Sequence, residues 1–389
     1  MRLIFVADGR SPTARNWIQY WIARGDEVHL ASTFPCDPIP HLAGLYAVSA
    51  AFSGRGPSTS PAPRVRDARL IKLRQTIRHW LGPLTLPRDA TRLREIVERV
   101  QPDLVHALRV PYEGMLAANA NLRVPLLVSI WGNDFTLHAP STPLMRIHTR
   151  RTMRAASALH ADCERDIRLA RAWGLAASKP TLVTPGNGGI HTDIFFPPAR
   201  PVDEPVIFNP RGFRVYVRND TFFQSIPLVL KEMPHAKFVC ASMEGQAEAL
   251  NWVNKLGIEK SVELLGPRPH AEMADVYRRA MILVSPSTHD GTPNTLLEGL
   301  ACGCFPIAGD LDSIREWITD GENGLLIDSG SPTALATAIL QAIKDKDLRA
   351  KAAGLNQAII AERAGYARNM AKAEEFYQEI ITQYAIRDT

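Results

Sequence analysis

Two carboxylates, Asp290 and Glu298, stand eight positions apart in the stretch of the chain with the clearest chemical signature. Carboxylates accept hydrogen bonds from hydroxyl groups and are poorly suited to bind phosphate. Between them, Asn294 and Thr295 follow Pro293 at the expected start of a helix, where free backbone N–H groups and the helix dipole favour an anion. These residues therefore predict one site that accepts hydroxyl hydrogen bonds and binds an anion.

The surrounding elements predict a strand–loop–helix–strand unit. An apolar run of strand length covers 281–284, and a turn-rich loop follows it. We expect Thr292 to be the N-cap of the helix and Pro293 its first residue. Gly303 is expected to end the helix, and 305–308 to form the next strand. Because α/β proteins bind ligands at the carboxyl edge of parallel strands, the unit fits a ligand with phosphate and hydroxyls, such as a nucleotide sugar.

This region resembles the signature of family-4 glycosyltransferases. The resemblance is carried by D-x7-E, by G-L-A-C-G-C-F-P-I at 299–307 and by G-E-N-G-L-L-I at 321–327. It implies the GT-B fold, an α/β fold with two Rossmann-like domains whose parallel sheets face a cleft and a C-terminal helix that crosses back to the first domain. It also implies a retaining transferase that moves a sugar from UDP or GDP to a hydroxyl of a glycan, lipid-linked or small-molecule acceptor. The resemblance implies no cofactor and no metal besides this nucleotide sugar.

By this resemblance, the C-terminal half binds the donor. Asp290 stands where the family has Glu and would hold the sugar hydroxyls as a catalytic residue, while Glu298 would accept hydrogen bonds from the ribose. Arg211 matches the first of two cations that hold the diphosphate. Tyr216 stands at the position of the second, and Arg218 is the nearest cation to it. The further donor-binding candidates are Arg268, Thr292, Asn294 and Thr295.

The N-terminal half supplies three candidate residues at the ends of expected strands. Gly9 follows the first strand, His106 lies near the end of the strand 103–107, and Asp134 follows the strand 124–130. The resemblance places His106 beside the transferred sugar, as a catalytic residue, and Asp134 in a G-x-D turn at the same cleft. A hydrogen-bonded structural role explains a lone histidine at a strand end equally well, so both roles stay open for His106.

The expected domains differ in charge. An N-terminal acceptor domain covers 1–198 and is completed by a helix at about 371–389, and a donor domain covers 199–370 after the proline-rich linker 197–205. The first 200 residues carry 26 Lys and Arg against 15 Asp and Glu. This excess indicates acidic partners, such as a nucleotide or an anionic membrane. The segment 64–81 predicts a basic amphipathic helix, which would either lie on a membrane or pack on the N-terminal core.

Several other classes of protein are less compatible with the sequence. The loop after the first strand lacks G-x-G-x-x-G, which disfavours a dehydrogenase. The basic half lacks interleaved aromatic residues, which disfavours nucleic-acid binding. A nucleotide-sugar epimerase or hydrolase, or a non-catalytic nucleotide-sugar-binding protein, stays open as an alternative. Without an apolar run of about 18 residues or a signal peptide, we expect a cytoplasmic protein, either free or peripheral on the inner face of the cell membrane.

Overall fold

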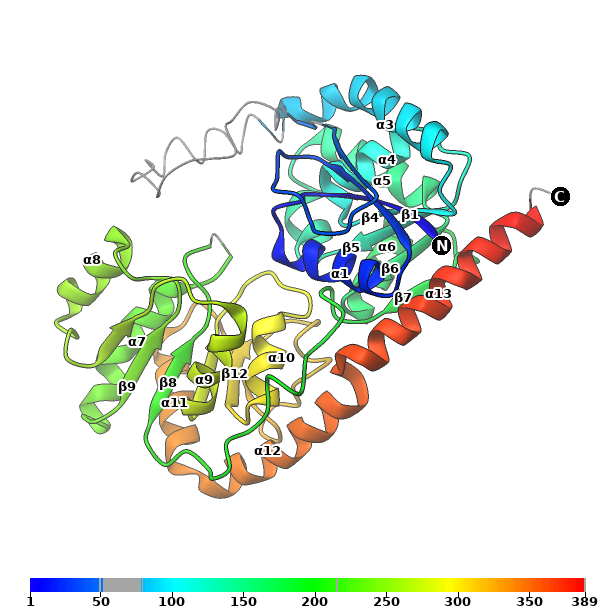
Figure 1. Ribbon diagram of the computed structural model, residues 1–389. Helices are drawn as coiled ribbons and strands as arrows, with labels where there is room; N and C mark the ends of the chain where they lie inside the picture. Colours follow the sequence, from blue (N-terminus) through cyan, green and yellow to red (C-terminus); the bar gives the residue numbers. More distant parts are fainter. Residues whose placement is uncertain (49, 52–77, 79, 215, 388–389) are drawn as a thin grey trace. The chain divides into compact units, whose positions relative to one another are not determined.

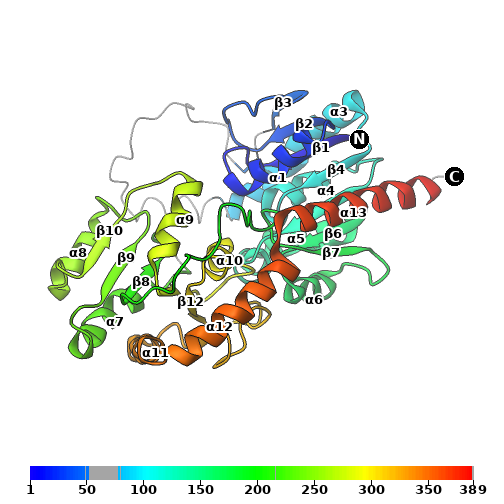
Figure 2. The ribbon, with the colours of Figure 1, turned by 60° about the horizontal axis from the view of Figure 1, so that its bottom comes forward.

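The chain forms two α/β units. The computed structural model describes residues 1–48, 50–51, 78, 80–214 and 216–387. One unit comprises Met1–Gly188 and Met370–Thr389, and the other comprises Gly189–Asn369. Each unit has its own parallel sheet with helices on both faces (Figures 1 and 2). The expected architecture of two α/β domains with parallel sheets is therefore confirmed.

The first unit is built on a seven-stranded parallel sheet in the order β3-β2-β1-β4-β5-β6-β7. Its central strands are short, fully buried and mostly apolar, as parallel strands covered on both faces usually are. The strands are β1 (Arg2–Ala7), β2 (Glu27–Ser32), β3 (Gly44–Ala47), β4 (Leu104–Ala107), β5 (Leu126–Ile130), β6 (Ala158–Ala161) and β7 (Thr181–Val183).

Helices cover the two faces of this sheet differently. One core cluster joins the sheet to α3 (Leu86–Val100), α4 (Met115–Asn119), α5 (Pro143–Ala155) and α6 (Glu164–Trp173). The opposite face meets α1 (Pro12–Ala23) and the C-terminal helix α13 (Tyr366–Arg387). There, Trp21 of α1 stacks on Tyr377 of α13 with ring centroids 4.1 Å apart. The last helix thus completes the N-terminal unit, as expected.

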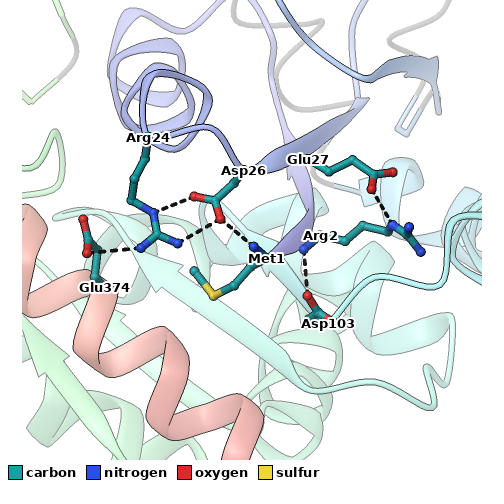
Figure 3. Close-up of polar contacts among 7 residues, drawn as sticks. All are labelled: Met1, Arg2, Arg24, Asp26, Glu27, Asp103 and Glu374. Atoms are coloured by element: carbon teal, nitrogen blue, oxygen red, sulfur yellow. Dashed lines mark hydrogen bonds and ion pairs between the residues drawn. The ribbon is translucent and has the colours of Figure 1, made fainter.

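Ion pairs at the edge of the first unit add to this packing (Figure 3). Arg24, just after α1, donates to Glu374 of α13 at 3.2 Å and to Asp26 at 2.7 Å. Asp26 also accepts a hydrogen bond from the amino group of Met1 at 2.7 Å. The Arg24–Glu374 pair, with side chains 28% and 29% exposed, contributes about 0–1 kcal/mol, so the apolar contacts of α13 dominate its attachment.

The second unit has a six-stranded parallel sheet in the order β10-β9-β8-β11-β12-β13. One face packs against α7 (Asn219–Glu232), α8 (Ala247–Leu256) and α11 (Pro332–Lys344), and the other against α9 (His270–Arg279) and α10 (Asn294–Ala301). The chain then continues through α12 (Lys346–Ile359). The strands are β8 (Val206–Asn209), β9 (Lys237–Cys240), β10 (Val262–Leu264), β11 (Ile282–Ser285), β12 (Phe305–Gly309) and β13 (Leu325–Ile327).

The segment proposed to contact a membrane is largely outside the described residues, which omit 52–77 and 79. At its end, Trp80 and Leu81 are 53% and 48% exposed, and Leu84 nearby is 62% exposed. Within the described ranges, no helix has the length and apolar character needed to span a bilayer.

Candidate functional site

The helix start predicted to bind an anion lies one residue later than expected. Pro293 has extended backbone angles, φ −68° and ψ 121°, so α10 begins at Asn294 without a side-chain cap. The prediction that Thr292 is the N-cap is wrong, because its buried hydroxyl accepts a hydrogen bond from Trp317 Nε1 at 2.9 Å. Among the described residues, the buried Asn294 Oδ1 and Thr295 Oγ1 atoms have no hydrogen-bond partner. The first turn of α10 thus offers uncapped amides beside two unsatisfied side-chain oxygens.

The predicted sugar-binding and diphosphate-binding residues contact each other directly. Arg211, two residues after β8, forms an ion pair through Nη1 with Asp290, in the loop after the neighbouring strand β11. The same guanidinium donates to Ser287 Oγ at 3.2 Å and to the Tyr216 hydroxyl at 3.3 Å. Burial lowers the pKa of Arg211, but the Asp290 carboxylate outweighs it and holds that pKa above its usual value. Tyr216, at the position of the missing second cation, therefore orients Arg211.

Arg218 and Arg268 have other contacts in the second unit. Arg218 forms a two-point ion pair with Asp220, at 2.7 and 2.8 Å, and its amide donates to the loop after β11. Arg268 follows β10 and lines a cavity of about 410 Å³ together with Glu244, Gly266 and neighbouring residues of that loop.

Glu298 lies in the middle of α10 and is 5% exposed. It accepts hydrogen bonds from the Tyr277 hydroxyl at 2.9 Å and from His270 Nε2 at 2.7 Å, both on the adjacent helix α9. The hydrogen bond to Glu298 raises the pKa of His270. Sequence reasoning missed both partners, although His270 and Tyr277 are seven positions apart and share one helical face. His270 and Tyr277 together hold the Glu298 carboxylate in place.

In the first unit, His106 lies in the interior and is 1% exposed. Its Nδ1 shares a hydrogen bond with the Tyr377 hydroxyl of α13, and its Nε2 lies 2.7 Å from Ser129 Oγ. Ser129 Oγ is 2.8 Å from His160 Nδ1, and Trp17 Nε1 donates to Tyr377 at 3.0 Å. Burial holds the pKa of His106 well below its usual value. The structure therefore places His106 in a neutral, buried polar chain that joins α13 to the sheet.

Asp134 and Gly9 also make contacts within the first unit. Asp134 is fully buried and accepts a hydrogen bond from Arg109 Nη2 at 2.6 Å, which ties the loop after β4 to the loop after β5. The Gly9 amide donates to Ser32 Oγ at 3.1 Å. A Cβ atom at Gly9 would collide with Cys36 Sγ, so close packing accounts for this glycine.

One group of buried side chains in the described part of the chain has the spacing of metal ligands. Its members are Asp162, Cys163 and Asp166, whose ligand atoms lie within 4.8 Å of one another. Arg165 already donates to Asp166 Oδ1 at 2.7 Å. Burial raises the pKa of Asp166. The guanidinium of Arg165 therefore supplies the positive charge that this cluster needs.

Comparisons with known proteins assign both units to the same class. Residues 8–186 match the family described as "Glycosyl transferase 4-like domain", and residues 210–345 match "Glycosyl transferases group 1". A D-inositol 3-phosphate glycosyltransferase of Thermobispora bispora is 26% identical over 52% of this chain and 51% of its own length. One of the same name from Corynebacterium kroppenstedtii is 34% identical over 32% of this chain and 28% of its own. The chain thus spans about half or less of the length of these relatives.

Solved structures share the fold along nearly the whole chain. Sucrose-phosphate synthase from Thermosynechococcus elongatus is 17% identical and superimposes with a TM-score of 0.76, covering 98% of this chain and 100% of that one. HepE from Anabaena, solved in complex with UDP-glucose, is 17% identical and gives a TM-score of 0.73, covering 97% and 100%. At this identity the likeness establishes the GT-B fold alone.

Proposed function

The chain belongs to the glycosyl transferases, with a 4-like domain followed by a group 1 domain, and on this premise we propose that it transfers a sugar from a nucleoside diphosphate sugar to a hydroxyl acceptor. The second unit binds the donor, and the first unit binds the acceptor. The complex of the fold neighbour HepE with UDP-glucose supports a UDP-linked donor.

The observation that carries this proposal is the open first turn of α10. Its N-terminal amides have no side-chain cap, and the Thr295 hydroxyl, which can donate to an anion, is buried without a partner among the described residues. Unsatisfied buried polar atoms are costly unless a ligand or water completes them. A diphosphate at this helix start would accept hydrogen bonds from the amides and from the Thr295 hydroxyl, and its negative charge would be favoured by the helix dipole.

Donor binding would rearrange the Arg211–Asp290 pair. Both side chains are only 12% exposed, and the Arg211 guanidinium forms an ion pair with the Asp290 carboxylate. A phosphate offers Arg211 a stronger two-point partner than a single carboxylate oxygen. Once Arg211 turns to the phosphate, the Asp290 carboxylate would accept hydrogen bonds from hydroxyls of the transferred sugar. Charge develops on the diphosphate as it leaves, and the Arg211 guanidinium and the helix dipole would stabilise that charge.

Glu298 would accept hydrogen bonds from the two ribose hydroxyls of the nucleotide. His270 and Tyr277 hold its carboxylate in place, so little reorganisation is needed when the ribose binds. We further propose that transfer retains the configuration at the sugar, as the resemblance implies. The positive charge of Arg211 and of the α10 N-terminus supports diphosphate departure without a metal ion.

A thermal unfolding screen with UDP, GDP and ADP tests the donor site. At a hundredfold excess over its Kd, the correct nucleotide should raise the free energy of unfolding by about 2.7 kcal/mol. Glu298→Gln should remove most of this stabilisation, whereas Glu322→Gln, at an exposed glutamate of the same unit, should leave it unchanged. If none of the three nucleotides stabilises the protein, the donor-site proposal fails. One nucleotide could instead stabilise the protein while no acceptor speeds the release of nucleoside diphosphate from the sugar nucleotide. In that case the chain is a nucleotide-sugar-binding protein.

A further inference from the structure

The sheet of the first unit has a point where the strand order reverses. β1 lies between β2 and β4. Strands β2 and β3 follow on one side of β1, and the later strands, from β4 to β7, lie on its other side. In open parallel sheets, ligands bind outside the carboxyl ends of the strands at such a point. The loops concerned here follow β1, from Asp8, and β4, from Leu108.

Arginines gather on aromatic rings at this edge. The Arg10 guanidinium, in the loop after β1, lies 3.7 Å from the centroid of the Phe34 ring, in the loop after β2. The Arg78 guanidinium lies 4.8 Å from the same ring and 4.3 Å from the ring of Tyr112, in the loop after β4. Arg109, from that same loop, lies 5.7 Å from the Trp131 ring. Cation–π contacts hold guanidinium groups in place without neutralising their charge.

Two of these three cations have carboxylate partners. Arg10 pairs with Asp8 at 2.9 Å, and Arg109 pairs with Asp134 at 2.6 Å. In the described ranges of the chain, Arg78 has no carboxylate partner, and its Nε atom is buried without a hydrogen bond.

The third acid at this edge, Glu113, is 2% exposed and accepts a hydrogen bond from Thr33 at 2.7 Å. Burial raises the pKa of Glu113, and the positive charges of Arg109 and Arg78 only partly offset this effect. Among the described residues, Arg10 and Arg109 have carboxylate ion-pair partners at this edge of the sheet, and Arg78 has none.

The backbone after β4 is held in an unusual conformation. Arg109 has φ 140° and Tyr112 has φ 68°, both in the region that side-chain-bearing residues rarely adopt. Such conformations cost about 1–3 kcal/mol each and are concentrated at functional sites. Here the conformation places Arg109 on Asp134 and the Tyr112 ring against Arg78, so the costly backbone positions two of the three cations.

We propose that Arg10, Arg78 and Arg109 form an oxyanion-binding subsite in the first unit, which recognises a phosphate or carboxylate group on the acceptor. This assignment of the ligand to the acceptor rests on the proposed function. Guanidinium groups bind both oxyanions with paired N–H donors. Arg78 forms no ion pair with a carboxylate of the described residues, so we expect it to contribute most to binding.

Arginine modification by phenylglyoxal, followed by mass spectrometry of peptides, locates the bound anion on the full chain. UDP is present throughout to fill the donor site, and sodium chloride keeps the ionic strength constant. At inorganic phosphate of twice its Kd, modification of Arg78 should slow about threefold, by simple occupancy. Modification of Arg92, an exposed arginine of α3, should keep its rate. An unchanged rate at Arg78, or equal slowing at Arg92, would overturn the subsite.

Variants separate this subsite from the donor site. Arg78→Gln should weaken phosphate binding, measured by calorimetry with UDP present, at least about tenfold, as expected for loss of a charged hydrogen bond. Arg92→Gln should bind phosphate as the wild type does. Undiminished phosphate binding by Arg78→Gln would refute the proposal.

Acetate, tested in the same way, separates the two sources of the oxyanion. Protection of Arg78 by phosphate alone identifies a phosphate subsite, and protection by both ions identifies one that also takes carboxylates. If UDP fails to stabilise any of these proteins while phosphate still protects Arg78, the proposed function fails and the oxyanion subsite stands.

Discussion

The two partners of the Arg211–Asp290 pair should affect nucleotide binding in opposite directions. The carboxylate of Asp290 forms an ion pair with the Arg211 guanidinium, which a diphosphate would also need. Arg211→Gln removes the cation and its charge-assisted hydrogen bonds to the ligand. Asp290→Asn instead removes the competing charge and keeps the shape of the side chain. A nucleotide diphosphate therefore loses a partner in the first variant and a competitor in the second.

The expected magnitudes follow from the burial of the pair. A hydrogen bond to a charged group contributes about 1.5–3 kcal/mol, so Arg211→Gln should weaken UDP binding by about 10- to 150-fold. Asp290→Asn should leave UDP binding unchanged or up to about tenfold tighter, because no buried carboxylate must be displaced. Without ligand, each variant leaves one charge poorly paired at a site only 12% exposed. Both should therefore lower the free energy of unfolding, by up to about 3 kcal/mol.

Calorimetric titration of UDP, together with urea unfolding, distinguishes these outcomes. The matched control is Lys344→Gln, which breaks the Lys344–Glu232 pair of the same unit. Those side chains are 58% and 52% exposed, so the change should cost about 0–1 kcal/mol and leave UDP binding unaltered. If Asp290→Asn weakens UDP binding as strongly as Arg211→Gln, the exchange of Arg211 from carboxylate to phosphate is refuted and the pair is only a structural brace.

Two further predictions concern the supporting contacts. The hydrogen bond to Glu298 raises the pKa of His270, so the stability that the pair adds is complete below the usual histidine pKa of about 6.5 and is lost as pH rises through the raised value. The Tm difference between the wild type and His270→Gln should thus shrink from about pH 6 to pH 9, and a constant difference would contradict the ion pair. Tyr377→Phe removes the hydroxyl shared by His106 and Trp17 and should lower the unfolding free energy by about 1–3 kcal/mol. UDP affinity should not change. A selective loss of UDP binding would contradict a purely structural role for these hydrogen-bonded side chains.

The predicted start of α10 shows why sequence signals were informative but incomplete. The apolar spacing and the proline located the helix to within one residue, because those signals act over a single turn. The choice of cap went wrong because Thr292 has a competing partner, Trp317, which is 25 positions away in the chain. Local pattern does not reveal a hydrogen bond that the fold forms at that distance.

The sequence by itself determined the two α/β domains, the carboxylates Asp290 and Glu298, and the helix start between them, because strand and helix patterns repeat over a few residues. The tertiary structure decided what each of these side chains contacts. Arg211 meets Asp290 across 79 positions, and His270 meets Glu298 across 28. His106 lies in the core because Tyr377, 271 positions away, returns on the last helix. Such contacts depend on strand order and on helix packing, and these arise only when distant segments fold together.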